Sequence, residues 1–153
     1  MDVFYGFEPI FDSNSKILIL GSFPSVKSRE TEFYYGNKQN RFWNTLGQFY
    51  GNIPQTIEDK KQLCHSCGIA LWDIVASCSI VGSMDNDITN YTLVDLSQVL
   101  NKCNVTKILC NGAKSYQLTL SAYKGNIPVI KMPSTSSANI RFDKSVWFTH
   151  LQI

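Results

Sequence analysis

The chain has 153 residues, 44% of them hydrophobic, and its 14 Lys and Arg residues against 12 Asp and Glu give a formal net charge of +2. This length predicts one domain, residues 1–153, with a core of its own, and argues against a second domain. The charge is too small to identify a nucleic-acid-binding protein, although a local basic surface can be hidden in a modest total.

No apolar run approaches the roughly 20 residues that span a bilayer, and residues 1–5 show no basic segment followed by an apolar one. We therefore expect a cytoplasmic protein with no membrane partner. Five cysteines, an odd number, favour reduced thiols over a disulfide framework. Cys64 and Cys67 form a C-x-x-C pair that can serve a metal site or a redox pair. No second such pair follows at a suitable spacing, so we interpret it as a helix end before Gly68 and expect no metal and no cofactor.

The predicted elements alternate between strands and helices. An unbroken apolar run closed by Gly21 predicts a strand buried on both faces. Asn40 can cap one helix, and a capping signal at Thr56 begins another, which ends before Gly68. In chain order we expect a strand at 17–21, helices at about 40–49 and 56–67, a strand at 69–73, a helix through 93–100, a strand at 105–110, a helix at 113–123, a strand at 127–132 and a helix at 144–151.

This alternation predicts a single-domain α/β fold, a three-layer α/β/α sandwich around a central, mostly parallel sheet of four strands. Polar loops follow all four strands: the Phe23 loop, Asp73, Asn111 and Ser134. The carboxyl ends of parallel strands meet at one edge of a sheet, where such folds place their ligands. We therefore expect these loops to form a crevice together.

Aromatic and amide side chains are clustered between residues 33 and 43. Rings can cover the face of a flat heterocycle while amides and main-chain groups contact its edge, so this mixture suits a base-sized ligand. The alternative is an ordinary turn at Gly21 and Pro24 with the rings filling the core.

Several segments along nearly the whole chain resemble the uracil-DNA glycosylase superfamily, in the form carried by its DNA-deoxyinosine (hypoxanthine-DNA) glycosylase branch. That branch is related to the G:T/U mismatch-specific DNA glycosylases. The matching segments are 21–30 (GSFPSVKSRE), 33–43 (FYYGNKQNRFW), 68–78 (GIALWDIVASC) with Gly82 and Ser83, 110–113 (CNGA) and 132–139 (MPSTSSAN).

The resemblance implies a single uracil-DNA-glycosylase-like domain that acts as a monofunctional DNA repair glycosylase. Such an enzyme flips a deaminated base, hypoxanthine or uracil, out of double- or single-stranded DNA and hydrolyses its N-glycosidic bond to leave an abasic site. It works without a cofactor, and we expect a monomer.

Three positions depart from the related patterns. Phe23 stands where mismatch-specific relatives carry an asparagine that positions the attacking water, and a phenyl ring can neither donate nor accept a hydrogen bond. Lys38 and Ser137 replace prolines, which loosens their loops more than it changes the chemistry. The first departure keeps open an alternative function, a catalytically weak DNA-damage or nucleotide-binding module that retains the fold. A nucleotide hydrolase is less favoured, because no Gly-x-x-x-x-Gly-Lys loop occurs.

Asn40 is our leading catalytic candidate, because an amide can both position water and donate to the departing base, and the branch places an asparagine in this stretch. Asp73, the carboxylate directly after an apolar strand, can accept a proton or stabilise positive charge on the sugar. The alternative for both residues is that they only cap helices. Phe42 and Trp43 are expected in the core.

The remaining site residues are expected to hold the base or the DNA backbone. Tyr35 matches the position whose ring stacks on the flipped base in relatives, and Asn37 stands where related sequences often carry a histidine. Ala138 and Asn139 come nearest to the position that wedges into the helix, and Ala138 is small for that task. The base-binding set is Phe23, Tyr35, Asn37 and Asn111, and the DNA-binding set is Ser22, Ser25, Lys27, Ser134, Thr135, Ser136, Ala138 and Asn139.

Overall fold

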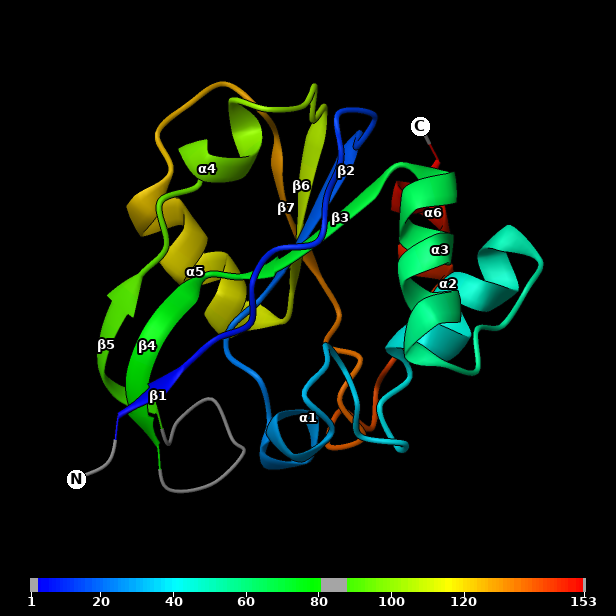
Figure 1. Cartoon of the computed structure of the whole chain (residues 1–153), viewed down its shortest axis with the longest axis horizontal. Helices are drawn as coiled ribbons and strands as arrows, with labels where there is room; N and C mark the ends of the chain where they lie inside the picture. The colour runs from blue at the N-terminus through cyan, green and yellow to red at the C-terminus, as the bar shows by residue number, and fades with distance from the viewer. Residues whose placement is uncertain (1–2, 81–87, 153) are drawn as a thin grey trace.

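The computed structural model describes residues 3–80 and 88–152, so Gly82 and Ser83 lie outside the described residues. Its centre is a parallel sheet of four strands in the order β3-β2-β6-β7 (Figure 1). The strands are β2 (Ile17–Gly21), β3 (Ile69–Asp73), β6 (Lys107–Asn111) and β7 (Val129–Met132). Each was predicted within two residues, and the predicted four-stranded parallel sheet is confirmed.

The strand register brings the polar strand ends together. Gly21 pairs with Asp73 across β2 and β3, and Asn111 pairs with Met132 across β6 and β7. Every residue of β2 and β3 is buried, because helices cover both faces of the sheet. The sheet is therefore a rigid platform whose carboxyl edge carries the polar loops.

Two separate cores lie on the two faces of the sheet, and side chains alternate between them along β2: Ile17 and Ile19 enter one, Leu18 and Leu20 the other. The first face packs against α2 (Phe42–Tyr50), α3 (Ile57–Cys67) and α6 (Lys144–Leu151). The second packs against α4 (Ser97–Leu100), α5 (Ala113–Ala122) and a small second sheet (Figure 1). This is the predicted three-layer arrangement.

Local capping explains where one predicted helix, α3, begins and ends. The Thr56 hydroxyl accepts from the Asp59 N–H while the Asp59 carboxylate reaches back to the Thr56 N–H, which completes a capping box. The same helix ends at Gly68, with φ of 71°, a conformation that favours glycine. The helix expected from Asn40 instead begins at Phe42, with Arg41 in the N-cap position.

The predicted helix through Leu93 is wrong. Leu93 is the last residue of β5 (Ile88–Leu93), which pairs with β4 (Val75–Ile80), and β4 pairs with β1 (Phe4–Tyr5). These strands form an antiparallel sheet in the order β1-β4-β5, and only α4 remains of the expected helix. Leu93 pairs with Val75, a residue much earlier in the sequence, and this pairing overrides the helical spacing of the local apolar residues.

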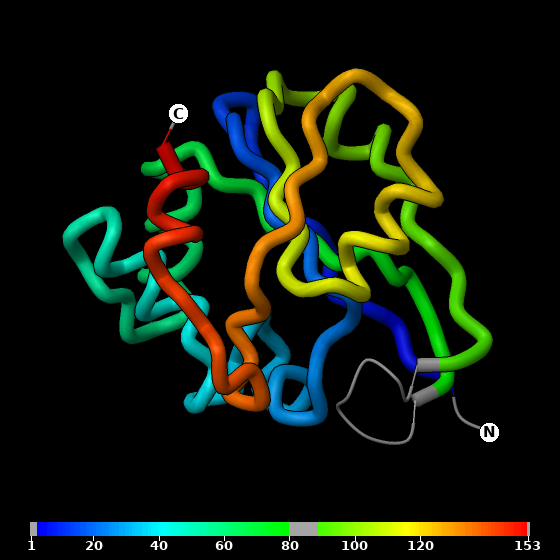
Figure 2. Tube along the Cα trace, turned by 180° about the vertical axis from the view of Figure 1, so that it is seen from behind, coloured from blue at the N-terminus to red at the C-terminus, as the bar shows by residue number. Residues whose placement is uncertain are grey.

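The short helix α1 (Val26–Thr31), which the sequence did not predict, lies at the carboxyl edge of the main sheet. Figures 1 and 2 show it beside the segments before α2 and after β7, at one end of the molecule. Within the described part of the chain, no helix combines the length and apolar character that a bilayer crossing requires.

Candidate active site

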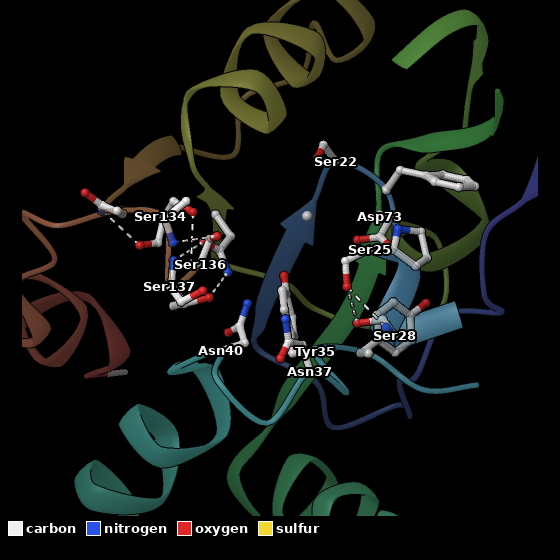
Figure 3. Close-up of a pocket in the computed structure, with 18 residues that line it drawn as sticks. Ser22, Ser25, Ser28, Tyr35, Asn37, Asn40, Asp73, Ser134, Ser136 and Ser137 are labelled. Carbon is white, nitrogen blue, oxygen red and sulfur yellow. Dashed lines mark hydrogen bonds between the residues drawn. The ribbon is translucent and has the colours of Figure 1, made fainter. Parts of the chain in front are cut away.

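A cavity of about 490 Å³ opens at the carboxyl edge of the parallel sheet (Figure 3). The loops after β2, β6 and β7, the end of β3 and the segment before α2 surround it. All predicted site residues except Lys27 line it: Ser22, Phe23, Ser25, Tyr35, Asn37, Asn40, Asp73, Asn111, Ser134, Thr135, Ser136, Ala138 and Asn139. The lining also includes Gly21, Pro24, Ser28, Tyr34 and Ser137. The four strand-end loops therefore form one crevice, as expected.

Asp73 lines the cavity, and only 5% of its surface is exposed. A Cβ on Gly21 would overlap the Asp73 Oδ1 atom and would come within 3.0 Å of the Tyr35 hydroxyl oxygen. The absence of a side chain at Gly21 therefore makes room for the carboxylate and brings the tyrosine hydroxyl close to the same point. This explains why glycine ends β2.

Asn40 presents its amide nitrogen to the cavity. Its Oδ1 accepts a hydrogen bond from the Phe42 N–H at 2.9 Å, just before α2 begins. The backbone N–H can only donate, so the oxygen of the amide must face it and the Nδ2 group must point the other way, into the cavity (Figure 3). The two alternatives for Asn40 thus coexist, since one end of the amide serves the helix and the other faces the cavity.

The backbone of Tyr35 is left-handed, with φ of 52°, a conformation that residues other than glycine adopt rarely. Its ring stacks on Phe42, with ring centroids 4.1 Å apart and planes 28° apart, and Phe42 is fully buried. Packing against the first core thus fixes the orientation of the Tyr35 ring. A ring supported in this way at a cavity wall is suited to stack on a flat ligand.

Ser28 ties the segments around the cavity together. Its buried hydroxyl oxygen accepts from the Gly36 N–H at 3.0 Å and from the Ser25 hydroxyl at 3.2 Å. The Ser25 oxygen in turn caps α1 by accepting from the Ser28 N–H at 3.1 Å. The sequence pattern did not single out Ser28, because its partner eight residues away is defined only by the folded loop.

Tyr34 is buried behind the cavity and donates its hydroxyl to the Glu8 carbonyl at 2.7 Å. Burial, reinforced by the negative charge of Asp73, raises the pKa of this hydroxyl far above its ordinary value. The hydroxyl therefore stays protonated and acts as a structural donor. The Trp43 indole donates to the Tyr34 carbonyl, and Trp43 itself is buried, so the predicted core position of Phe42 and Trp43 is confirmed.

Asn111 uses both ends of its amide on Thr135. Its Nδ2 donates to the Thr135 hydroxyl and its Oδ1 accepts from the Thr135 N–H, each at 3.0 Å. Thr135 is only 1% exposed. Asn111 lines the cavity, but this geometry favours positioning of the loop after β7 over contact with a base, and its base-binding role stays a prediction.

Arg41 joins the segment before α2 to the loop after β7. Its Nη2 donates to the carbonyls of Ser136 and Asn139, at 3.1 and 2.8 Å, and its own N–H donates to the Thr135 carbonyl. Its guanidinium also lies 4.7 Å from the centre of the Phe142 ring. Arg41 thus holds two cavity walls together.

Phe23 and Lys27 are placed less centrally than the sequence suggested. Phe23 borders the cavity, but its ring packs against the second core, with the Arg29 guanidinium 5.9 Å from the ring centre. Lys27 lies on the exposed side of α1, with its Nζ 3.6 Å from the Glu30 carboxylate and outside the cavity lining. A base contact by Phe23 and a phosphate contact by Lys27 stay predictions.

The turn after the cavity wall presents an apolar side chain that the sequence did not single out. Asn139 donates its Nδ2 to the Ser134 carbonyl and accepts at Oδ1 from the Arg141 N–H, so its side chain is held against the loop. The next residue, Ile140, is 92% exposed. Ile140 therefore offers the large apolar surface that Ala138 and Asn139 lack.

The C-x-x-C pair lies at the end of α3, as expected. Cys64 is fully buried, and burial raises the pKa of its thiol to about 12, so it is protonated at neutral pH. Cys67 is half-buried. Among the residues that the structure describes, no group of three His, Cys, Asp or Glu side chains is arranged to hold a metal ion.

Comparison with known proteins gives consistent matches along the chain. A family model for the uracil DNA glycosylase superfamily matches residues 8–151. A protein named hypoxanthine DNA glycosylase from Methanosarcina acetivorans is 36% identical over 146 residues, covering 92% of this chain and 90% of its own length. One of the same name from Methanosarcina barkeri is 33% identical over 145 residues, with the same coverage.

The fold also matches a solved structure. The solution NMR structure of a candidate uracil DNA glycosylase from Methanosarcina acetivorans superposes with a TM-score of 0.83 at 31% sequence identity. The match covers 99% of this chain and 98% of the other.

Proposed function

This chain belongs to the uracil DNA glycosylase superfamily, and we propose that it is a DNA glycosylase that removes hypoxanthine, and more slowly uracil, from DNA. The observation that supports the proposal best is the cavity itself. It combines a nearly buried carboxylate, a supported aromatic ring and an inward-facing amide donor at the carboxyl edge of the sheet. A carboxylate can stabilise the positive charge on the sugar, an amide can donate to the departing base, and an aromatic ring can stack on it.

In the proposed reaction, a water oxygen bonds to C1′ of the deoxyribose while the bond from C1′ to the base nitrogen breaks. The electron pair of that bond leaves with the base, and the proton of the water passes to an acceptor. Asp73 is suited to accept that proton and to stabilise the positive charge that develops on the sugar. Its burial strengthens both effects, because water screens the carboxylate poorly there.

Asn40 takes the complementary role. Its Oδ1 is already occupied by the Phe42 N–H, so it offers Nδ2 as a donor to the departing base and stabilises the negative charge that collects there. Asn40 was expected both to position water and to donate to the departing base, and we keep only the second role in the proposal. Tyr35 is proposed to stack on the base, and the loop after β7, held by Arg41, to contact the phosphates through its hydroxyl and main-chain donors.

The proposal is tested by measuring abasic sites in oligonucleotides that carry hypoxanthine, uracil, xanthine or mispaired thymine. With enzyme in excess and no added metal or cofactor, we expect hypoxanthine to be released fastest and uracil second. Alkaline cleavage of the abasic product provides the readout. If no lesion yields product while the DNA still binds, the chain is a binding module and the proposed activity is wrong. A monomeric state and a cytoplasmic location stay predictions.

Ile140→Ala is expected to lower excision from duplex DNA about tenfold and to leave excision from single strands unchanged. An apolar side chain inserted between base steps offsets the cost of unstacking, which a single strand does not impose. Arg41 holds the carbonyl of the preceding residue, Asn139, so Ile140 is presented by an anchored turn.

Single-turnover rates on the two substrates measure this effect. Leu120→Ala is the matched control, because Leu120 is also an exposed aliphatic residue but lies on α5, outside the cavity lining. Equal duplex rates for Ile140→Ala and the wild type would show that another residue supports base extrusion.

A further inference from the structure

The two ends of the Tyr35 side chain have different surroundings. Tyr35 as a whole is half-buried and lines the cavity, whereas its hydroxyl oxygen is buried (Figure 3). Stacking on a base needs only the ring. Burying a hydroxyl costs free energy unless the group forms a hydrogen bond, so its presence here indicates a role separate from stacking.

The Tyr35 hydroxyl and the Asp73 carboxylate approach the same point, the space beside Gly21 where a side chain would begin. A Cβ in that space would overlap the Asp73 Oδ1 atom and would lie 3.0 Å from the Tyr35 hydroxyl oxygen. Burial raises the pKa of the Tyr34 hydroxyl most, and Asp73 and Tyr35 then act in the same direction, which places both groups near one hydroxyl. Oxygen atoms from two segments of the chain therefore meet beside one glycine.

The backbone around Tyr35 holds the hydroxyl at this point. A left-handed conformation, with φ of 52°, costs free energy in a residue other than glycine and persists only where the neighbouring structure enforces it. Both neighbours of Tyr35 are anchored: the Tyr34 hydroxyl donates to the Glu8 carbonyl at 2.7 Å, and the Gly36 N–H donates to the Ser28 hydroxyl at 3.0 Å. The fold thus maintains a strained backbone that directs the hydroxyl towards the carboxylate.

We infer that Tyr35 is a positioning residue for Asp73, whose Oδ1 accepts a hydrogen bond from the Tyr35 hydroxyl, so that the second carboxylate oxygen faces the sugar. A phenolic O–H can donate one hydrogen bond, an ionised carboxylate can only accept, and such charge-assisted bonds are strong. The ring then serves the base and the hydroxyl serves the carboxylate. The inference rests on the proposed function and adds no proton transfer to it, because the phenol keeps its proton and the proton of the water passes to the second oxygen.

Tyr35→Phe removes the hydroxyl and keeps the ring. We expect single-turnover release of hypoxanthine at saturating enzyme to fall about tenfold or more, because a carboxylate that is no longer held loses its orientation. Affinity for a strand with 2′-fluoro-deoxyinosine, in which the fluorine suppresses cleavage, should stay within about twofold of the wild type, because stacking is retained. Tyr50→Phe is the matched control, since the half-buried Tyr50 donates to the Leu151 carbonyl at 3.5 Å, outside the cavity lining.

A double-mutant cycle on stability tests the pair without any need for activity. Urea unfolding is measured for the wild type, Tyr35→Phe, Asp73→Ala and the double variant. We expect Tyr35→Phe to raise the unfolding equilibrium constant about tenfold more in the wild type than in Asp73→Ala, the usual effect of one hydrogen bond to a charged group. The same cycle with Tyr50→Phe should show equal effects in the two backgrounds.

A coupling below about twofold in the Tyr35 cycle would overturn the inference, because the two side chains would then act independently. A wild-type rate for Tyr35→Phe would overturn it as well, and equal losses of rate and affinity would assign the hydroxyl to DNA binding instead. The stability cycle judges the pair even if the excision assay detects no product. Conversely, normal release of hypoxanthine by the wild type without coupling would leave the proposed glycosylase activity intact.

Discussion

Asn40→Ala is expected to slow release of hypoxanthine by a factor of about a hundred or more, the usual effect of removing one preorganised donor from a site of developing charge. The substitution removes the Nδ2 donor that faces the cavity. It also removes the acceptor for the Phe42 N–H at the start of α2, which costs roughly 0.5–2 kcal/mol of stability by analogy with lost helix caps. Single-turnover rates with saturating enzyme separate the chemical effect from weaker binding.

Asn40→Asp separates the two roles of this side chain. One carboxylate oxygen still accepts from the Phe42 N–H, so the helix start is retained, while the donor to the base is lost. We expect its melting temperature to lie near that of the wild type and its rate to be at least as low as that of Asn40→Ala. A rate close to wild type for Asn40→Asp would show that the donor has no part in catalysis.

Asp73→Asn is expected to reduce the rate of release by a comparable factor, about a hundredfold or more. The amide has nearly the shape of the carboxylate and fits the space left by Gly21, but it carries no negative charge to stabilise the sugar and is a poor proton acceptor. We expect the folded state to tolerate the change well, since burying a charge is costly and active-site groups often reduce stability.

The matched control for Asp73 is Asp95→Asn. Asp95 is exposed and accepts a hydrogen bond from the Ser97 N–H, at the first residue of α4, at 3.0 Å. It lies outside the main cavity lining, and an asparagine preserves this bond. The Asp95→Asn variant should release hypoxanthine at the wild-type rate. If Asp73→Asn is severe while Asn40→Ala is mild, the carboxylate carries the chemistry and our preference for Asn40 is reversed. If Asp73→Asn is mild, Asp73 serves packing at the end of β3.

Much of the candidate site was accessible from the sequence because it lies where buried strands end. Asp73 and Asn111 end β3 and β6, and Ser134 follows β7, so the parallel order of the sheet brings them to one edge. Ser28 and Ile140 were missed for different reasons. Ser28 acts through loop contacts that no strand end marks, and Ile140 is distinguished only by its exposure, which has no signal in the sequence.

The second sheet shows the limit of local patterns for the fold as well. The apolar spacing from Leu93 to Leu100 fits a helix, yet Leu93 pairs with Val75 on β4. Strand pairing satisfies backbone groups through a partner elsewhere in the chain, so a window of neighbouring residues cannot predict it.

The sequence by itself determined what depends on near neighbours: the buried strand that ends at Gly21, the capping box at Thr56, and the polar residues that leave the carboxyl edge of the sheet. Only the tertiary structure decided which atoms of those polar residues remain available to a ligand. Arg41 donates to the carbonyl of Asn139, 98 residues away, whereas Asn40 keeps its amide nitrogen because a local N–H takes only its oxygen. Each hydrogen bond within the protein occupies one donor and one acceptor. When the partner is distant in the chain, only the folded structure shows which atoms of a polar side chain can still bind a ligand.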